Sequence, residues 1–160
     1  MTPAERYTKI AAYGGAPERL MHALKQFPKE MWQYKPAPNR WSIHEIIIHL
    51  ADSEANSFVR CRCFVAEPGK TIMPYDQDLW ASKTGYHRQD ADDALELFRL
   101  LRKMSFDLIR MLPEQSWQSR IMHPESGEML FERWLEIYEA HIPKHIEQMR
   151  RNYEVWKQSR

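Results

Sequence analysis

Glycine and cysteine are scarce in this chain. Only five of its 160 residues are glycine, and no alternating apolar and polar run is bounded by turn residues, so a β-sheet is not expected. The two cysteines, Cys61 and Cys63, lie two positions apart in a helical pattern, where their side chains would not face each other. A disulfide between them is therefore not expected, and a reducing, cytoplasmic environment fits this cysteine usage.

An excess of charge and long apolar runs are also missing. The chain has 23 basic and 22 acidic residues, for a formal net charge of +1, so it lacks the electrostatic footprint of proteins that bind nucleic acid or anionic lipid. No stretch approaches the roughly 18 apolar residues of a membrane span. Charges also interrupt the N-terminal region where a signal peptide needs its apolar segment. We expect neither a nucleic-acid partner nor a membrane partner.

Helical periodicity is abundant. The length and a hydrophobic fraction of 43% suit a single domain over residues 1–160. Four windows carry apolar residues at helical spacing, and the second begins with a capping-box signature, Ser42 with Glu45. The predicted helices cover residues 17–27, residues 43–66, a segment from Asp90 or Asp92 to just before Pro113, and residues from 131 almost to the C-terminus. This pattern predicts an all-α four-helix bundle with a long connection between the second and third of these helices.

Two histidines, His141 and His145, stand four positions apart in the last helical window. Side chains at this spacing project within about 40° of each other and can bring two nitrogens to one metal ion. They could equally be partly exposed histidines that bond to neighbours. His49, at the edge of the apolar face of the second window, offers a third imidazole, and three nitrogens with an open position are typical of a catalytic metal site. Periodicity alone does not show that the two helices meet at these heights.

Pro143 lies between the paired histidines, where a proline removes one helical hydrogen bond at a cost of about 3 kcal/mol. A local kink or bulge that turns both rings toward a common point would explain it. The alternative is that the helix starts anew near Ile142. For the remaining histidines, at positions 22, 44, 87 and 123, surface or turn roles are expected.

Four sequence blocks together resemble the DinB/YfiT-like family. They are "RWSIHEIIIHLADSE" at residues 40–54, "MPYDQDLWA" at 73–81, "HPESGEM" at 123–129 and "WLEIYEAHIPKHIEQM" at 134–149. The resemblance implies a four-helix bundle of the DinB type that forms homodimers and holds a divalent metal on three histidines. Matched residue by residue, these ligands fall on His49, His141 and His145. Zinc, nickel, iron or manganese suit such a ligand set.

The resemblance also implies a function class without naming a substrate. Related proteins include metal-dependent hydrolases and transferases that use low-molecular-weight thiols, so we expect an enzyme that acts on a small molecule. Asp52 and Glu54 are candidate catalytic carboxylates that would accept a proton, and Glu45 is a candidate hydrogen-bond partner of His49. All three could instead be solvated residues on a helix flank. A non-catalytic metal-binding stress-response protein, a dimerisation scaffold and a bundle without an ion remain alternatives.

Other residues near the expected site have two interpretations. Arg60 and Arg62 could recognise the carboxylate or sugar groups of a thiol, or could lie at the surface. The connection that contains Tyr75, Asp76 and Trp80 could cover the mouth of the metal site. Alternatively, Trp80 holds the connection to the bundle while Asp76 caps a short helical turn.

Overall fold

The computed structural model describes residues 1–160 and is mostly helical. Its α-helices are α1 (Pro3–Gly14), α2 (Ala16–Leu24), α3 (Ile43–Ala66), α4 (Gln77–Lys83), α5 (Ala91–Ile109) and α6 (Phe131–Gln158). Three short 3-10 helices, η1 (Lys29–Met31), η2 (Tyr86–Arg88) and η3 (Glu114–Gln118), and two strands, β1 (Arg120–His123) and β2 (Gly127–Leu130), complete the structure. None of the helices combines the length and the apolar character that crossing a bilayer requires.

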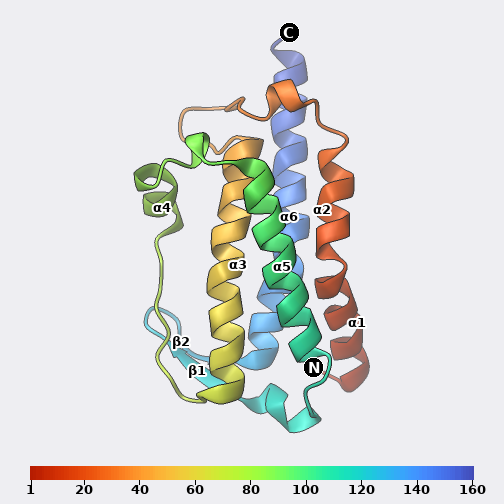
Figure 1. Cartoon of the computed structure of the whole chain (residues 1–160), viewed down its shortest axis with the longest axis vertical. Coiled ribbons are helices and arrows are strands. Elements are labelled where there is room, and N and C mark those ends of the chain that lie inside the picture. Colours follow the sequence, from red (N-terminus) through yellow and green to blue (C-terminus); the bar gives the residue numbers. More distant parts are fainter.

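The long helices form a four-helix bundle, as predicted. Figure 1 shows α1 and α2 following each other along one edge, so that together they make one column beside α3, α5 and α6. Local signals set the helix starts: Ser42 and Glu45 form the expected capping box of α3. Asp90, rather than Asp92, caps α5 by accepting hydrogen bonds from the backbone of the two residues at positions 92 and 93.

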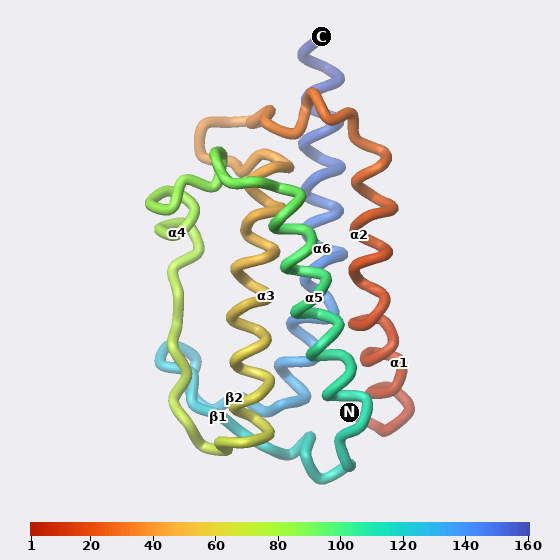
Figure 2. Tube along the Cα trace, viewed as in Figure 1, coloured from red at the N-terminus to blue at the C-terminus, as the bar shows by residue number.

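The long connection between α3 and α5 follows from their direction. In Figure 2 the colour of each of these helices shows residue numbers that increase from top to bottom, so the two helices are parallel. The chain must therefore return along the bundle between them. Adjacent parallel helices require such a crossover, whereas antiparallel neighbours need only a short loop. The connection contains α4 and η2, and Asp76 caps α4 by accepting hydrogen bonds from the backbone N–H groups of Asp78 and Leu79.

A small β-hairpin corrects the expectation that the chain contains no sheet. β1 and β2 pair antiparallel, from Arg120 opposite Leu130 to His123 opposite Gly127, and Thr71 forms an isolated bridge with Met122. Each strand has only four residues, which is too short for an alternating pattern to be recognised. Gly127 adopts φ +75°, a conformation that favours glycine, directly after the turn. The hairpin lies at the end of the bundle where α6 begins (Figure 1).

Two apolar clusters fill the bundle, and a buried ion pair lies between them. One cluster includes Phe98 and the other includes Tyr13. The guanidinium of Arg102 contacts both rings, at 5.3 Å and 3.9 Å from their respective centroids, and its Nη2 donates to Glu54 Oε2 at 2.6 Å. Tyr13 donates its hydroxyl to the other oxygen of the same carboxylate at 2.9 Å.

Candidate metal centre

The bundle brings together three histidines that are far apart in the sequence. His49 comes from α3, whereas His141 and His145 come from adjacent turns of α6. The Nε2 atom of His141 lies 3.4 Å from that of His49 and 3.1 Å from that of His145. One ligand atom of each histidine lies within 4.8 Å of the other two.

These separations fit a shared cation. Two nitrogens that each lie 2.0–2.1 Å from one ion at the tetrahedral angle are about 3.4 Å apart. The two shortest Nε2 separations, at 3.1 and 3.4 Å, are close to that value. Three imidazole nitrogens suit divalent ions of borderline softness, and three protein ligands leave further coordination positions for a substrate. The donor set therefore fits a divalent metal.

Burial keeps the three imidazoles neutral. It lowers the pKa of His49 to about 3, and the charge of His145 contributes in the same direction. Burial also lowers the pKa of His141 well below its usual value, with smaller contributions from His145 and His49. For His145 burial again lowers the pKa, although its hydrogen bond with Gln148 opposes the shift. Because a metal binds the neutral ring, protons compete weakly with a cation at these nitrogens.

Neighbouring side chains orient two of the rings. His145 Nδ1 lies 2.9 Å from Gln148 Oε1, so this nitrogen donates to the amide oxygen and leaves the Nε2 lone pair free for a metal. The ring of His49 packs against Trp41, with 4.7 Å between centroids. Sequence reasoning missed both contacts, although a glutamine three residues after a candidate ligand is a usable signal on a helix.

The expected contact between Glu45 and His49 is not formed. The Glu45 carboxylate instead accepts hydrogen bonds from the backbone N–H of Ser42 at 2.9 Å and from Lys35 Nζ at 3.0 Å. His49 Nδ1 is buried and has no hydrogen-bond partner. Because the capping box fixes the Glu45 side chain at the start of the helix, this prediction is wrong.

Pro143 lies inside a continuous helix. α6 runs from Phe131 to Gln158 without interruption, so the alternative in which a helix starts anew near Ile142 is wrong. The neighbouring Ile142 is fully buried. The packing of this long apolar face offsets the hydrogen bond that the proline removes, while both histidines remain on one side of the helix.

The two candidate carboxylates have different surroundings. Asp52, one turn after His49, accepts a hydrogen bond from the Tyr86 hydroxyl at 2.6 Å. Burial, and then that hydrogen bond, raises the pKa of Tyr86. Glu54 projects about 140° away from His49 around the helix and is held by Arg102 and Tyr13. This placement does not support the prediction that Glu54 accepts a proton beside the metal ligands, and we propose no catalytic role for it.

The connection before α5 borders the mouth of the site. A cavity of about 260 Å³ is lined by His145 and Gln148 from α6, Gln77 and Asp78 from α4, and residues 39–41. Trp80 packs against the apolar core and against Tyr75, with 4.8 Å between the ring centroids of the two aromatic residues. α4 is thus held to the bundle, and its first residues border the cavity that His145 lines.

The other reactive side chains lie outside this centre. His44 Nε2 is 2.8 Å from the backbone oxygen of Gln89, and His123 Nδ1 accepts from two backbone N–H groups of the hairpin turn. Both cysteines are buried and free, and burial raises the pKa of Cys61 to about 12. Neither cysteine is suited to act as a nucleophile.

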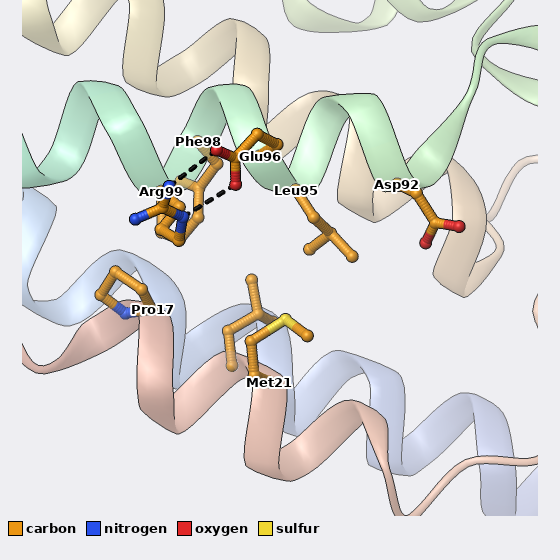
Figure 3. A pocket seen from close by; sticks show the side chains of 8 residues that line it. Pro17, Met21, Asp92, Leu95, Glu96, Phe98 and Arg99 are labelled. Carbon is orange, nitrogen blue, oxygen red and sulfur yellow. Dashed lines mark hydrogen bonds and ion pairs between the residues drawn. The ribbon is translucent and has the colours of Figure 1, made fainter.

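A separate pocket lies between α2 and α5. Pro17, Met21, Leu95 and Phe98 contribute its apolar lining, and Arg99 pairs with Glu96 at its edge (Figure 3). None of the three clustered histidines lines this pocket, so it is distinct from the candidate metal centre.

Fold and site together define a class: helical-bundle proteins whose core presents three histidines suited to a divalent metal. A family model described as the DinB superfamily matches residues 12–149. The chain therefore belongs to the DinB superfamily, as its sequence blocks indicated.

Relatives and a solved structure agree with this assignment. A protein of Oceanobacillus iheyensis named "putative metal-dependent hydrolase" is 31% identical over 106 residues, which cover 66% of this chain but only 61% of that protein. YfiT of Bacillus subtilis, with the same description in its name, is 27% identical over 131 residues, or 81% of this chain and 74% of YfiT. The solved structure of YfiT superposes with a TM-score of 0.87 at 23% identity, covering 95% of this chain and 87% of that one. It is described as a probable metal-dependent hydrolase with an unusual four-helix bundle topology.

The low pKa of His49 predicts that the metal-free protein loses stability in mild acid. The folded pKa of about 3 lies below the unfolded value of 6.5, so the unfolded chain binds more protons below pH 6.5. The contribution of His49 is complete above pH 6.5 and is lost as pH falls toward 3. Between pH 7 and pH 5 this histidine alone should lower the free energy of unfolding by roughly 2 kcal/mol.

Urea unfolding of the protein in EDTA at the two pH values measures this loss. His49→Leu, which cannot be protonated at this position, should show a smaller loss than the parent protein. Equal losses in both proteins would show that His49 is not responsible.

Proposed function

We propose that this protein is a metal-dependent enzyme, in the first instance a hydrolase, that acts on a small molecule at the three-histidine centre. The convergence of three Nε2 atoms from two helices is the observation that carries the proposal. The names of the relatives support it. Zinc or nickel is the proposed ion, because imidazole nitrogens suit both.

A divalent cation bound there would act as a Lewis acid and would lower the pKa of a substrate or solvent group bound to it. This would supply a nucleophile near neutral pH. The chain's own residues would hold and orient the reactants. Gln148 fixes the tautomer of His145, and Trp41 covers one side of His49. Asp52 is the proposed proton acceptor, with Tyr86 holding its carboxylate in place.

Transfer to a low-molecular-weight thiol is the second chemistry proposed for the same centre. The same Lewis acidity would favour the thiolate of a bound thiol over the neutral thiol. Neither Cys61 nor Cys63 could replace an external thiol, because burial raises the pKa of both groups. A thiol would therefore have to come from a second substrate.

Activity measurements on untagged protein test these proposals. We expect hydrolysis of at least one member of a panel of chromogenic esters and amides, or conjugation of a small thiol, with loss in EDTA and recovery when metal is restored. Asp52→Asn should lower kcat by about 100-fold or more while the protein still binds metal. Glu96→Gln, which alters an exposed carboxylate away from the three histidines, is the control.

A protein that binds one ion per chain but shows no metal-dependent activity on any of these substrates would favour the non-catalytic alternative. Activity that is unchanged in Asp52→Asn would contradict the proposed proton acceptor only, and would leave the metal-dependent enzyme in place.

A further inference from the structure

A second cavity lies along α3 on the side of the connection. Its volume is about 470 Å³, and its lining comes from three parts of the chain: Asn56 and Arg60 of α3, Lys70 and Met73 of the connection, and Trp80 of α4. Met73 is 67% exposed, so the cavity opens to solvent. Its size is within the range of sites for small molecules.

Arg60 carries the unpaired charge of this cavity. Two other charged residues line it, Lys70 and Glu67, and they pair with each other at 2.7 Å, so their charges offset. Arg60 forms no ion pair. Its Nη2 donates to the backbone oxygen of Met73 at 3.1 Å, and its Nη1 lies 3.4 Å from the Tyr138 hydroxyl.

The guanidinium of Arg60 also retains unused hydrogen-bonding capacity. Its Nε is buried and has no partner. An arginine presents five N–H donors in a planar fork that matches the two oxygens of a carboxylate. A partly buried arginine without a counter-ion is costly unless an anion pairs with it.

Arg60 is close to the candidate metal centre. The Tyr138 hydroxyl that it contacts belongs to a ring whose centroid is 6.0 Å from that of His141. The Tyr138 side chain therefore contacts both Arg60 and one of the candidate metal ligands. Burial raises the pKa of Tyr138, so its hydroxyl keeps its proton at neutral pH.

We propose that Arg60 is a specificity-determining residue that binds an oxyanion, a carboxylate or a phosphate, on one end of a substrate whose other end reaches the three histidines. The inference rests on the proposed function, because it assigns a substrate class to the same site. Neutral small molecules of similar size would bind more weakly, since they leave the arginine unpaired.

Binding of defined anions tests this proposal without relying on turnover. The probes are glutarate for a carboxylate, methyl phosphate for a phosphate and glutaramide as the neutral match, titrated into metal-loaded protein by calorimetry. Arg60→Met should weaken binding of the preferred anion by about 10- to 100-fold, as expected for the loss of charge-assisted hydrogen bonds. Arg60→Lys keeps the charge but lacks the planar pair of donors, so its affinity for the anion should lie between those of the parent protein and Arg60→Met.

Arg62→Met is the matched control, because Arg62 is on the same helix but stacks on Phe58 and does not line the cavity. It should bind the anions as the parent protein does. Metal content and melting temperature of each variant show whether a loss reflects the cavity or the fold. Equal affinity for glutaramide and glutarate, or unchanged anion binding in Arg60→Met, would overturn the proposal.

Turnover supplies an independent comparison. The ester 4-nitrophenyl hydrogen glutarate carries a free carboxylate, whereas 4-nitrophenyl acetate does not. Arg60→Met should raise KM for the anionic ester by about 10-fold or more and leave that of the neutral ester nearly unchanged. Equal losses for both esters would contradict a specificity role. If neither ester is hydrolysed, the binding titrations alone decide the role of Arg60, and the wider substrate panel decides whether the protein is an enzyme.

Discussion

His49→Ala should reduce the metal content of the purified protein from near one divalent ion per chain to background. This histidine supplies the only ligand from α3, so its loss leaves two nitrogens on one helix. Removing residues that merely orient a ligand costs about 10- to 100-fold in metal affinity, and removing the ligand itself should cost more than 100-fold. Elemental analysis of untagged protein measures the content, and calorimetric titration with Zn²⁺ measures the affinity.

Metal should also change the stability of the parent protein but not that of the variant. An ion that binds only the folded state raises the melting temperature with its concentration. His22→Ala is the control, because this histidine is exposed on α2 and belongs to no cluster. Full metal content in His49→Ala, or a similar loss in His22→Ala, would refute the assignment of the three-histidine centre.

Glu54→Ala should destabilise the fold by about 3–5 kcal/mol, the effect expected when one partner of a buried ion pair is removed. Glu54 and Arg102 are both almost fully buried, at 1% and 0% exposure. Without the carboxylate, the guanidinium of Arg102 would remain in the core with only backbone oxygens as partners, and the Tyr13 hydroxyl would lose its acceptor. Urea denaturation with circular dichroism at pH 7 measures the change.

An exposed pair on α5 provides the comparison. Glu96 and Arg99 form an ion pair at 2.7 Å in solvent, and Glu96→Ala should cost less than about 1 kcal/mol. The double variant Glu54→Leu with Arg102→Met should recover much of the loss, because it removes both charges together. A double variant that is less stable than Glu54→Ala would show that the pair contributes through contacts other than its charges.

The starts of α3 and α5 were predictable because their signals are local. The capping box at Ser42 and Glu45 and the N-cap at Asp90 each involve residues within one turn, so the sequence itself contains both partners. The hairpin at residues 120–130 was missed because four-residue strands carry too little pattern. Pro143 was ambiguous for a related reason: the packing that keeps α6 continuous comes from other helices.

The candidate site was predictable in part. The pairing of His141 with His145 is a property of helical spacing, and the place of His49 at the edge of an apolar helix face made it the third candidate. The resemblance of four sequence blocks to a known family then pointed to the same three histidines. The roles of the carboxylates were not predictable. Glu54 and Asp52 are separated by two positions on α3, and their side chains therefore project in different directions, toward Arg102 in one case and Tyr86 in the other.

By itself the sequence determined where the helices begin, which of their faces are apolar and which side chains on one helix lie together, since these properties depend on neighbours in the chain. Only the tertiary structure decided that α3 and α6 meet at the height of the histidines. It also decided that Glu54 forms a buried ion pair with Arg102, whereas Arg60 has no ion-pair partner. Those facts depend on the packing of segments dozens of residues apart. Packing of that kind is fixed by the shape and charge of the partners rather than by spacing along the chain.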